Sequence, residues 1–223
     1  MPRYYSEKLS TERLRRCYEI APPRVRQYLE AEIGHVLGHV RPGDVFLELG
    51  CGYGRVMERI ADRAGKVIGI DTSPANVQMA RRLLADHGNC DVLRMDAISL
   101  GFRDQVFDVV VCAQNGISAF GVDPEALIAE SVRVTRAGGR VLFSSYADGF
   151  WEPRLEWFRL QAEQGLIGEI DWDATGDGVI VGKDGFRATT IDAAGFEELT
   201  SNLAVQRRVV EVDGSSLFCE LGV

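Results

Sequence analysis

The sequence lacks the features that would place it among membrane-spanning, secreted or repetitive proteins. No stretch approaches the run of about 18 apolar residues that a membrane-spanning helix needs. The first eight residues carry no apolar run behind their charges, so we expect no signal peptide. Internal repeats and low-complexity segments are also absent. The 223 residues, 46% of them hydrophobic, predict one domain, or one domain with a modest insertion, and no membrane partner.

Paired cysteines and excess positive charge are missing too. The five cysteines are scattered without a C-x-x-C pair, which favours reduced thiols in a cytoplasmic protein over disulfides or a zinc site. Acidic residues outnumber basic ones by 33 to 25, which argues against nucleic acid as a partner. His35 and His39 have the i, i+4 spacing of a helical metal pair. Because the sequence shows no third ligand beside them, we expect no bound metal.

Short apolar runs alternate with helical patterns through the middle of the chain. Runs rich in Val and Ile are typical of strands buried on both faces. The alternation predicts an α/β fold with a doubly wound, mostly parallel sheet and helices on both faces. The runs cover residues 45–49, 66–70, 92–95, 107–112 and 140–144, and the helical patterns cover 54–63, 74–86 and 123–136.

The two ends of the chain add elements to this core. Strands over 205–212 and 217–221 flank Asp213-Gly214, a strong hairpin signal, and predict a seventh, antiparallel last strand. A further helix is expected over 192–203. Residues 1–40 predict a helical cap, with helices over 3–20 and 24–40, ahead of a main domain over 41–223. A helix over 151–164 and a small β insertion or lid over 166–191 follow the fifth strand.

Glycines occupy every second position after the first strand, in Glu48-Leu49-Gly50-Cys51-Gly52-Tyr53-Gly54-Arg55. Glycine lets a chain turn tightly and a ligand approach closely, and the following helix offers N–H groups to an anion. The triphosphate motif G-x-x-x-x-G-K-[ST] is absent, and Arg55 stands where the dinucleotide fingerprint needs Gly or Ala. An NAD-dependent dehydrogenase is therefore the weaker alternative. Asp71 ends the second strand, where a carboxylate can accept hydrogen bonds from ribose hydroxyls.

These motifs resemble the class I S-adenosylmethionine-dependent methyltransferases, closely over residues 45–146 and loosely in the terminal hairpin. The resemblance implies that the glycine loop wraps the methionine half of S-adenosyl-L-methionine, Asp71 holds the ribose and Asp96 pairs with the adenine amino group. Residues 133–140 are similar to the family's lead into strand five, although Ala137 stands where proline is common. The cofactor-binding residues expected on this basis are Glu48, Gly50, Cys51, Gly52, Gly54, Asp71, Thr72, Met95, Asp96, Ala97, Gln114 and Tyr5.

The methyl acceptor is expected beyond the fourth strand, because ligands of such sheets lie outside the carboxyl ends of the strands. Gln114 and Asn115 follow that strand and, with Tyr146, are the candidates for positioning it. The alternative for Asn115-Gly116 is a turn needed only by the backbone. Neutral amides cannot take a proton at neutral pH, so no catalytic base is assigned.

The predicted function is methyl transfer to an O, N or S atom of a small molecule by in-line displacement. The N/D-P-P-Y signature for amide or base nitrogen is absent, which removes the simplest assignment to nucleic acid. Tyr4, Tyr5 and Tyr18 are either core residues or a cover for the cofactor. The alternative function is a non-catalytic cofactor-binding or scaffold protein of the same fold. The sequence is compatible with a monomer or a homodimer.

Overall fold

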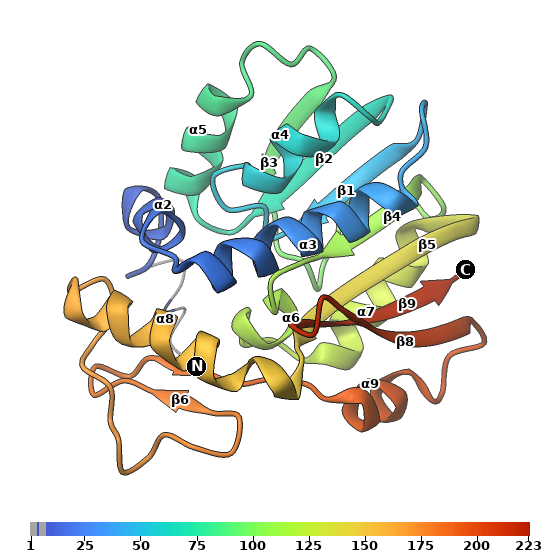
Figure 1. Ribbon diagram of the computed structural model, residues 1–223. Coiled ribbons are helices and arrows are strands. Elements are labelled where there is room, and N and C mark those ends of the chain that lie inside the picture. Colours follow the sequence, from blue (N-terminus) through green and yellow to red (C-terminus); the bar gives the residue numbers. More distant parts are fainter. Residues whose placement is uncertain (1–3, 5–7) are drawn as a thin grey trace.

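The computed structural model describes residue 4 and residues 8–223 and is built on a seven-stranded sheet of order β3-β2-β1-β4-β5-β9-β8 (Figure 1). Neighbours from β3 to β5 are parallel, whereas β9 runs antiparallel to both β5 and β8. The expected mostly parallel sheet is confirmed, and its antiparallel last strand lies inside the sheet. The strands are β1 (Val45–Leu49), β2 (Lys66–Asp71), β3 (Cys90–Arg94), β4 (Phe107–Cys112), β5 (Thr135–Tyr146), β8 (Gln206–Val212) and β9 (Ser216–Gly222).

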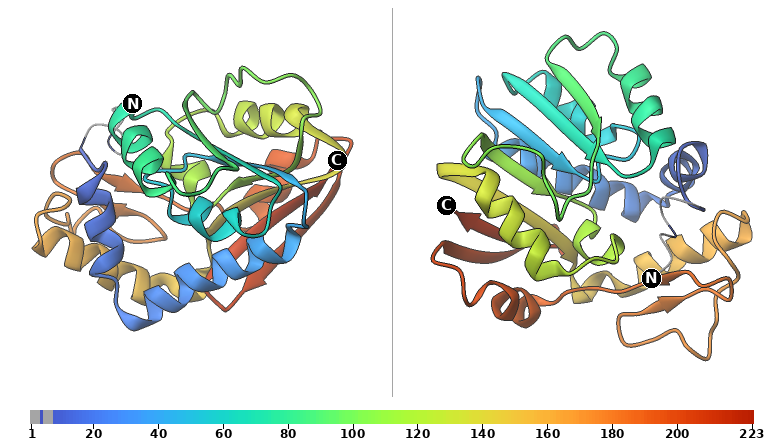
Figure 2. Two further views of the ribbon diagram at one scale, coloured as in Figure 1. Left: turned by 90° about the horizontal axis from the view of Figure 1, so that it is seen from above. Right: turned by 180° about the vertical axis from the view of Figure 1, so that it is seen from behind.

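Helices cover both faces of the sheet, because successive residues of the buried strands point to opposite sides. Phe46 and Val109 pack against α3, α4 and α5, whereas Leu47 and Val110 pack against α6, α7 and α9 (Figure 2). The expected doubly wound arrangement is confirmed. The first layer holds α3 (Pro23–His39), α4 (Arg55–Ala61) and α5 (Pro74–Leu83), and the second holds α6 (Gly116–Ala119), α7 (Pro124–Val134) and α9 (Ala193–Thr200).

Several element boundaries differ from the sequence prediction, most of all where α7 meets β5. Helix α7 ends at Val134, not at residue 136, and β5 begins at Thr135. The strand starts early because the N–H of Val106 donates to the carbonyl of Val134 (2.8 Å) and holds the chain beside β4. The one-turn helix α6 was not predicted. It forms because Gln114 and Asn115 adopt positive φ angles of 55° and 58° and turn the chain sharply after β4.

A third group of elements gathers at the carboxyl ends of the parallel strands, at the lower left of Figure 1. We call this group, which comprises α2, the first half of α3 (residues 23–29), α8 and residues 164–191, the cap. The expected β insertion is a hairpin of β6 (Ile180–Val181) and β7 (Arg187–Ala188). The described part of the expected helix over 3–20 is α2 (Glu12–Glu19), and α8 covers Trp151–Glu163.

The cap has an apolar core of its own that joins distant parts of the chain. Tyr28, Phe158 and Phe186 belong to this core, which is separate from the two cores beside the sheet. Trp157 Nε1 donates to the carbonyl of Cys17 (2.8 Å), and so joins α8 to α2. The hydroxyl of Tyr4 donates to Asp184 Oδ2 (2.6 Å) in the β insertion. The N-terminal helices and the insertion therefore pack as one unit.

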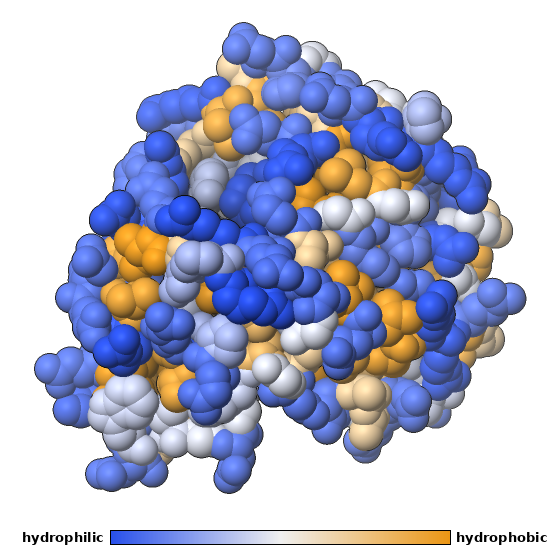
Figure 3. All heavy atoms as spheres, viewed as in Figure 1, coloured by the Kyte–Doolittle hydropathy of each residue, from blue (hydrophilic) through white to orange (hydrophobic). Residues whose placement is uncertain are grey.

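The surface in Figure 3 carries apolar residues in several separate patches divided by hydrophilic ones. Within the described part of the chain, no helix is both long and apolar enough to cross a membrane.

Candidate cofactor and acceptor site

A cavity with about 1000 Å³ of empty space lies between the sheet's carboxyl edge and the cap. Leu9, Leu14 and Tyr18 line it from the N-terminal side, and Phe120 lines it from the end of α6. The predicted site residues that line the cavity are Gly50, Gly52, Asp71, Thr72, Met95, Asp96, Ala97 and Gln114.

The glycine loop is shaped by close contacts. Gly50 has a φ of 69°, and a Cβ there would lie 2.3 Å from the Phe120 ring. Gly54 is not among the residues that line the cavity, and its contact with a cofactor stays a prediction. Its φ of 96° and the approach of Ala80, whose Cβ would be 3.3 Å away, account for the glycine. Burial raises the pKa of the Cys51 thiol well above its usual value, so this side chain is a small neutral wall.

A small recess beside the glycine loop holds two unsatisfied charged groups. Glu48 Oε2 and Arg55 Nη2 are buried, and neither has a hydrogen-bond partner among the described residues. The guanidinium of Arg55 stacks on the ring of Tyr18, 4.8 Å from its centroid. Burial raises the pKa of Glu48 to about 8, while the charge of Arg55 opposes that rise. A ligand with an ammonium and a carboxylate would satisfy both side chains, which are otherwise costly to bury.

Asp71 connects the glycine loop to the next helix. Its carboxylate accepts hydrogen bonds from the N–H groups of Gly52 (3.0 Å) and Ser73 (2.8 Å). Burial raises its pKa, and these hydrogen bonds oppose that rise. Asp71 therefore fixes the turn that leads into α5, and it also lines the cavity, where a ligand hydroxyl can reach it.

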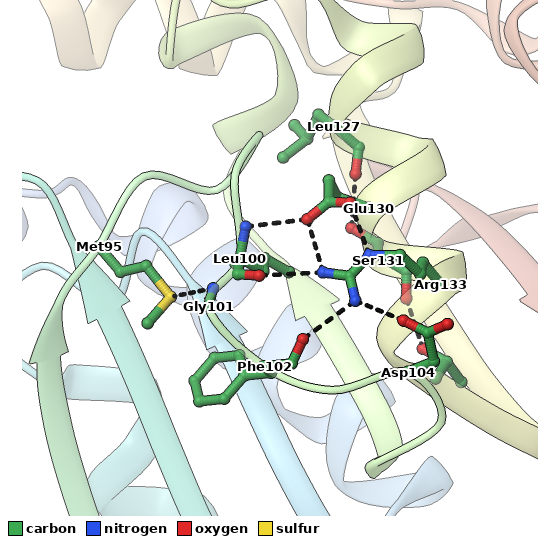
Figure 4. Close-up of polar contacts among 10 residues, drawn as sticks. Met95, Leu100, Gly101, Phe102, Asp104, Leu127, Glu130, Ser131 and Arg133 are labelled. Carbon is green, nitrogen blue, oxygen red and sulfur yellow. Dashed lines mark hydrogen bonds and ion pairs between the residues drawn. The ribbon is translucent and has the colours of Figure 1, made fainter.

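The loop after β3, which carries Asp96, is fixed by Arg133 of α7 (Figure 4). Arg133 donates to the carbonyls of Leu100 and Phe102 (both 3.0 Å) and pairs with Glu130 (2.7 Å). Arg133 holds the pKa of Glu130 below its usual value, and Glu130 in turn accepts from the N–H of Leu100 (2.8 Å). This anchoring gives a physical reason for an arginine in the segment 133–140.

Residues 47–143 match the family model described as a methyltransferase domain. This stretch is under half of the chain, and its match supports the resemblance to the class I S-adenosylmethionine-dependent methyltransferases. It is 31% identical to the malonyl-[acyl-carrier protein] O-methyltransferase of Serratia marcescens, over 59% of this chain and 49% of that one. It is 30% identical to the ubiquinone biosynthesis O-methyltransferase of Nitrosomonas europaea, over 57% and 52%.

The chain thus spans about half the length of these curated relatives. A crystal structure of a Pyrococcus horikoshii protein superposes with a TM-score of 0.69 at 20% identity, covering 100% of this chain and 99% of that one. This likeness shows that the two proteins share one fold over the whole of this chain, cap included.

The residues after β4 divide between the large cavity and the protein interior. The hydroxyl of Tyr18 donates to Gln114 Oε1 (2.5 Å), and Gln114 Nε2 is buried without a partner among the described residues. Gln114 is therefore available to a ligand. Asn115 instead donates to the carbonyl of Thr189 (2.7 Å) and accepts from Ser145 Oγ (3.1 Å). Asn115 borders a cavity, and its side chain also holds the β insertion to β5, so it has a structural role beside the predicted role toward the acceptor, which stays a prediction.

A second cavity, with about 500 Å³ of empty space, adjoins the first and shares Leu9, Leu14, Tyr18, Gln114 and Ala119 with it. The cap supplies most of its remaining wall, and no Asp, Glu, Lys, Arg or His of the described chain lines it. Burial raises the pKa of Tyr146 to about 12, so its hydroxyl stays protonated. The remaining lining residues are Cys17, Asn115, Tyr146, Trp157, Phe158, Gln161 and Ala188.

Of the tyrosines considered from the sequence, Tyr18 contributes to both cavities and Tyr4 belongs to the cap core. Tyr5, an expected cofactor residue, lies outside the described residues. The residue that sequence reasoning missed is Arg55, which it used only to exclude a dinucleotide. Its position directly after the last glycine of the loop was the available signal.

Glu32 of α3 is a buried carboxyl group with no hydrogen-bond partner among the described residues for either oxygen. Burial raises its pKa from 4.5 to about 7, although the hydroxyls of Ser144 and Ser216 oppose this. A raised carboxyl pKa contributes stability that is complete below the unfolded value and is lost as pH rises through the folded value. Stability attributable to Glu32 should therefore fall between about pH 4.5 and pH 7.

We expect Glu32→Gln to match the wild type at pH 5 and to exceed its free energy of unfolding at pH 8 by roughly 2–3 kcal/mol. Urea unfolding at the two pH values measures this difference. Glu48 titrates in both proteins, so its effect cancels in the comparison. A stability difference that is the same at both pH values would contradict the assignment.

Proposed function

We propose that this protein transfers a methyl group from S-adenosyl-L-methionine to a small, uncharged acceptor. The observation that carries the proposal is the pair of buried, unsatisfied groups on Glu48 and Arg55 at one end of the large cavity. An amino-acid ligand offers the ammonium and the carboxylate that this pair lacks. The adjoining cavity provides room for an acceptor.

The cavity residues fit the cofactor along its whole length. Glu48 would accept from the ammonium and Arg55 would donate to the carboxylate. Asp71 and Asp96 line the cavity at the ends of β2 and β3, where they would hold the ribose hydroxyls and the adenine amino group. The recess, Asp71 and Asp96 thus provide a partner for each polar group of a ligand that has no phosphate.

The chain's own contribution to methyl transfer would be positioning and exclusion of water. When bound, the cofactor supplies a methyl group on a sulfonium. An aligned nucleophile can take this methyl group as S-adenosyl-L-homocysteine leaves. Tyr18 orients Gln114, and the partnerless Nε2 of Gln114 can donate to a ligand at the junction of the two cavities. Alignment of reactants can supply roughly 7–11 kcal/mol of a barrier, so no charged base is required at this site.

The acceptor cavity also bears on the type of acceptor. Its walls are mainly aromatic and aliphatic, and its described polar groups are amides, a thiol and hydroxyls. A charged acceptor would lose its hydration there without gaining an ion pair. We therefore propose an uncharged acceptor with an apolar or planar part. The relatives named as O-methyltransferases favour an oxygen acceptor over nitrogen or sulfur.

The test is incubation of the protein with S-adenosyl-L-methionine and a library of metabolites, with release of S-adenosyl-L-homocysteine measured. We expect turnover with at least one uncharged, partly apolar member of the library. Tight cofactor binding without acceptor-dependent release across the library would support the non-catalytic alternative and contradict the proposal.

Gln114→Ala and Asn115→Ala should have opposite signatures. Loss of the Gln114 amide removes one hydrogen bond to ligand, so we expect kcat to fall up to about tenfold with little change in Tm. Loss of the Asn115 amide leaves Ser145 and Thr189 unsatisfied and places alanine at positive φ, so we expect about 2–3 kcal/mol less stability. Thermal unfolding and saturation kinetics of both variants check this. The same signature in both would contradict the division of roles.

A further inference from the structure

The two histidines that the sequence places one helical turn apart gain a third potential metal ligand in the folded chain. His35 and His39 lie on α3, and Glu220 of β9 faces both of them. Among the residues that the structure describes, these three form the single group of metal-ligating side chains with all ligand atoms within 4.8 Å of one another. The group lies on α3 and β9, outside both cavities.

The separations of the ligand atoms suit a small tetrahedral ion. Glu220 Oε1 lies 3.0 Å from His35 Nε2 and 3.5 Å from His39 Nε2. A Zn²⁺ ion with bonds of about 2.0–2.2 Å places its ligand atoms about 3.3 Å apart, between these two values. All three ligand atoms lie within 4.8 Å of one another, so small movements of the side chains would bring them onto one ion.

The surroundings also suit a metal ion more than an exposed ion pair. The Glu220 side chain is 8% exposed, and each imidazole is 19% exposed, which leaves access for an ion and a water. Phe218 packs against His35, with ring centroids 4.4 Å apart, and forms an apolar wall behind the ligands. Two imidazole nitrogens and one carboxylate oxygen, with one open position, are a known ligand set for zinc.

We propose that His35, His39 and Glu220 bind one divalent transition-metal ion, for which Zn²⁺ is the best match. The site would join α3 to β9 across 185 positions of sequence. The first half of α3 belongs to the cap, so the bound ion would stabilise the helix from which the cap extends. This proposal does not depend on the methyltransferase activity.

The test is calorimetric titration of the metal-free full chain with Zn²⁺, and thermal unfolding with and without the ion. We expect one ion per chain, and at about a hundred times the dissociation constant a rise in Tm of roughly 5–10 °C. His39→Ala and Glu220→Gln each remove one ligand of the ion. Each variant should therefore weaken zinc binding by a factor of at least about 30. His87→Ala, which removes the third histidine of the chain, is the matched control and should bind as the wild type does.

Circular dichroism of each variant verifies that the fold is intact, and His39→Gln replaces His39→Ala if the alanine variant unfolds. Absence of zinc binding by the wild type would overturn the proposal and leave a hydrogen-bonded cluster. Zinc binding that persists in both His39→Ala and Glu220→Gln would place the ion elsewhere and would also overturn the proposal. Loss of zinc binding in Cys90→Ser, which removes the least buried of the five cysteines, would do the same.

Discussion

Replacing Arg55 with methionine is expected to weaken binding of S-adenosyl-L-homocysteine by about 3 kcal/mol, a factor of roughly 100. The variant removes the charged donor that we assign to the ligand's carboxylate, and it leaves the Glu48 carboxyl group without the guanidinium beside it. Methionine keeps much of the arginine side chain's packing against Tyr18, so the fold should survive. Isothermal titration calorimetry at pH 7 measures the change.

Arg59→Met is the matched control, because Arg59 lies one turn further along α4, is exposed and pairs with Glu30 (2.7 Å). This control should bind the ligand as the wild type does. Methylthioadenosine, which lacks the amino-acid group, should bind to Arg55→Met and wild type with equal affinity. Wild-type affinity of Arg55→Met for S-adenosyl-L-homocysteine would mean that the carboxylate lies elsewhere.

Replacing Trp157 with alanine is expected to destabilise the protein by about 3–5 kcal/mol. The indole is 5% exposed, lies in the cap core and donates to the carbonyl of Cys17, so the variant removes both packing and the link to α2. Urea unfolding should report the loss, and hydrogen exchange should accelerate in α2 and residues 164–191 before it does in the central strands. Turnover should fall because Trp157 also lines the acceptor cavity.

Trp172→Ala is the control for this prediction, because Trp172 also lies in the cap but is 58% exposed. We expect a change within about 0.5 kcal/mol for that variant. Trp157→Phe, with a smaller expected loss, is available if the alanine variant does not fold. Exchange in the cap that is unchanged by Trp157→Ala would show that the cap is not held together by this core.

The alternating core of the protein could be predicted because its strands are short apolar runs buried on both faces. Val109, Val110 and Val111 are all buried, and no other element accommodates such a run so readily. The antiparallel hairpin was predictable from Asp213-Gly214, whose φ angles of 58° and 61° favour these residue types. The positions of Asp71 and Asp96, whose carboxylates are predicted to hold the cofactor, followed from the ends of β2 and β3.

The residue roles that could not be predicted from the sequence depend on contacts between distant segments. The side chain of Asn115 binds the carbonyl of Thr189, 74 positions away, and this contact gives the residue a structural role that no local pattern indicates. Glu220 meets His35 across 185 positions, so no local pattern marks it as a third ligand. Arg55 directly follows the glycine loop in the sequence, but its proposed role toward a ligand's carboxylate depends on the burial of Glu48 beside it.

The most direct test of the central claim is a crystal structure of the protein with S-adenosyl-L-homocysteine. We predict that the amino-acid group lies between Glu48 and Arg55, the ribose at Asp71 and the adenine at Asp96. The ligand's sulfur should face the acceptor cavity beside Gln114. A ligand bound outside this cavity, or bound with its adenine in the Glu48–Arg55 recess, would contradict the account.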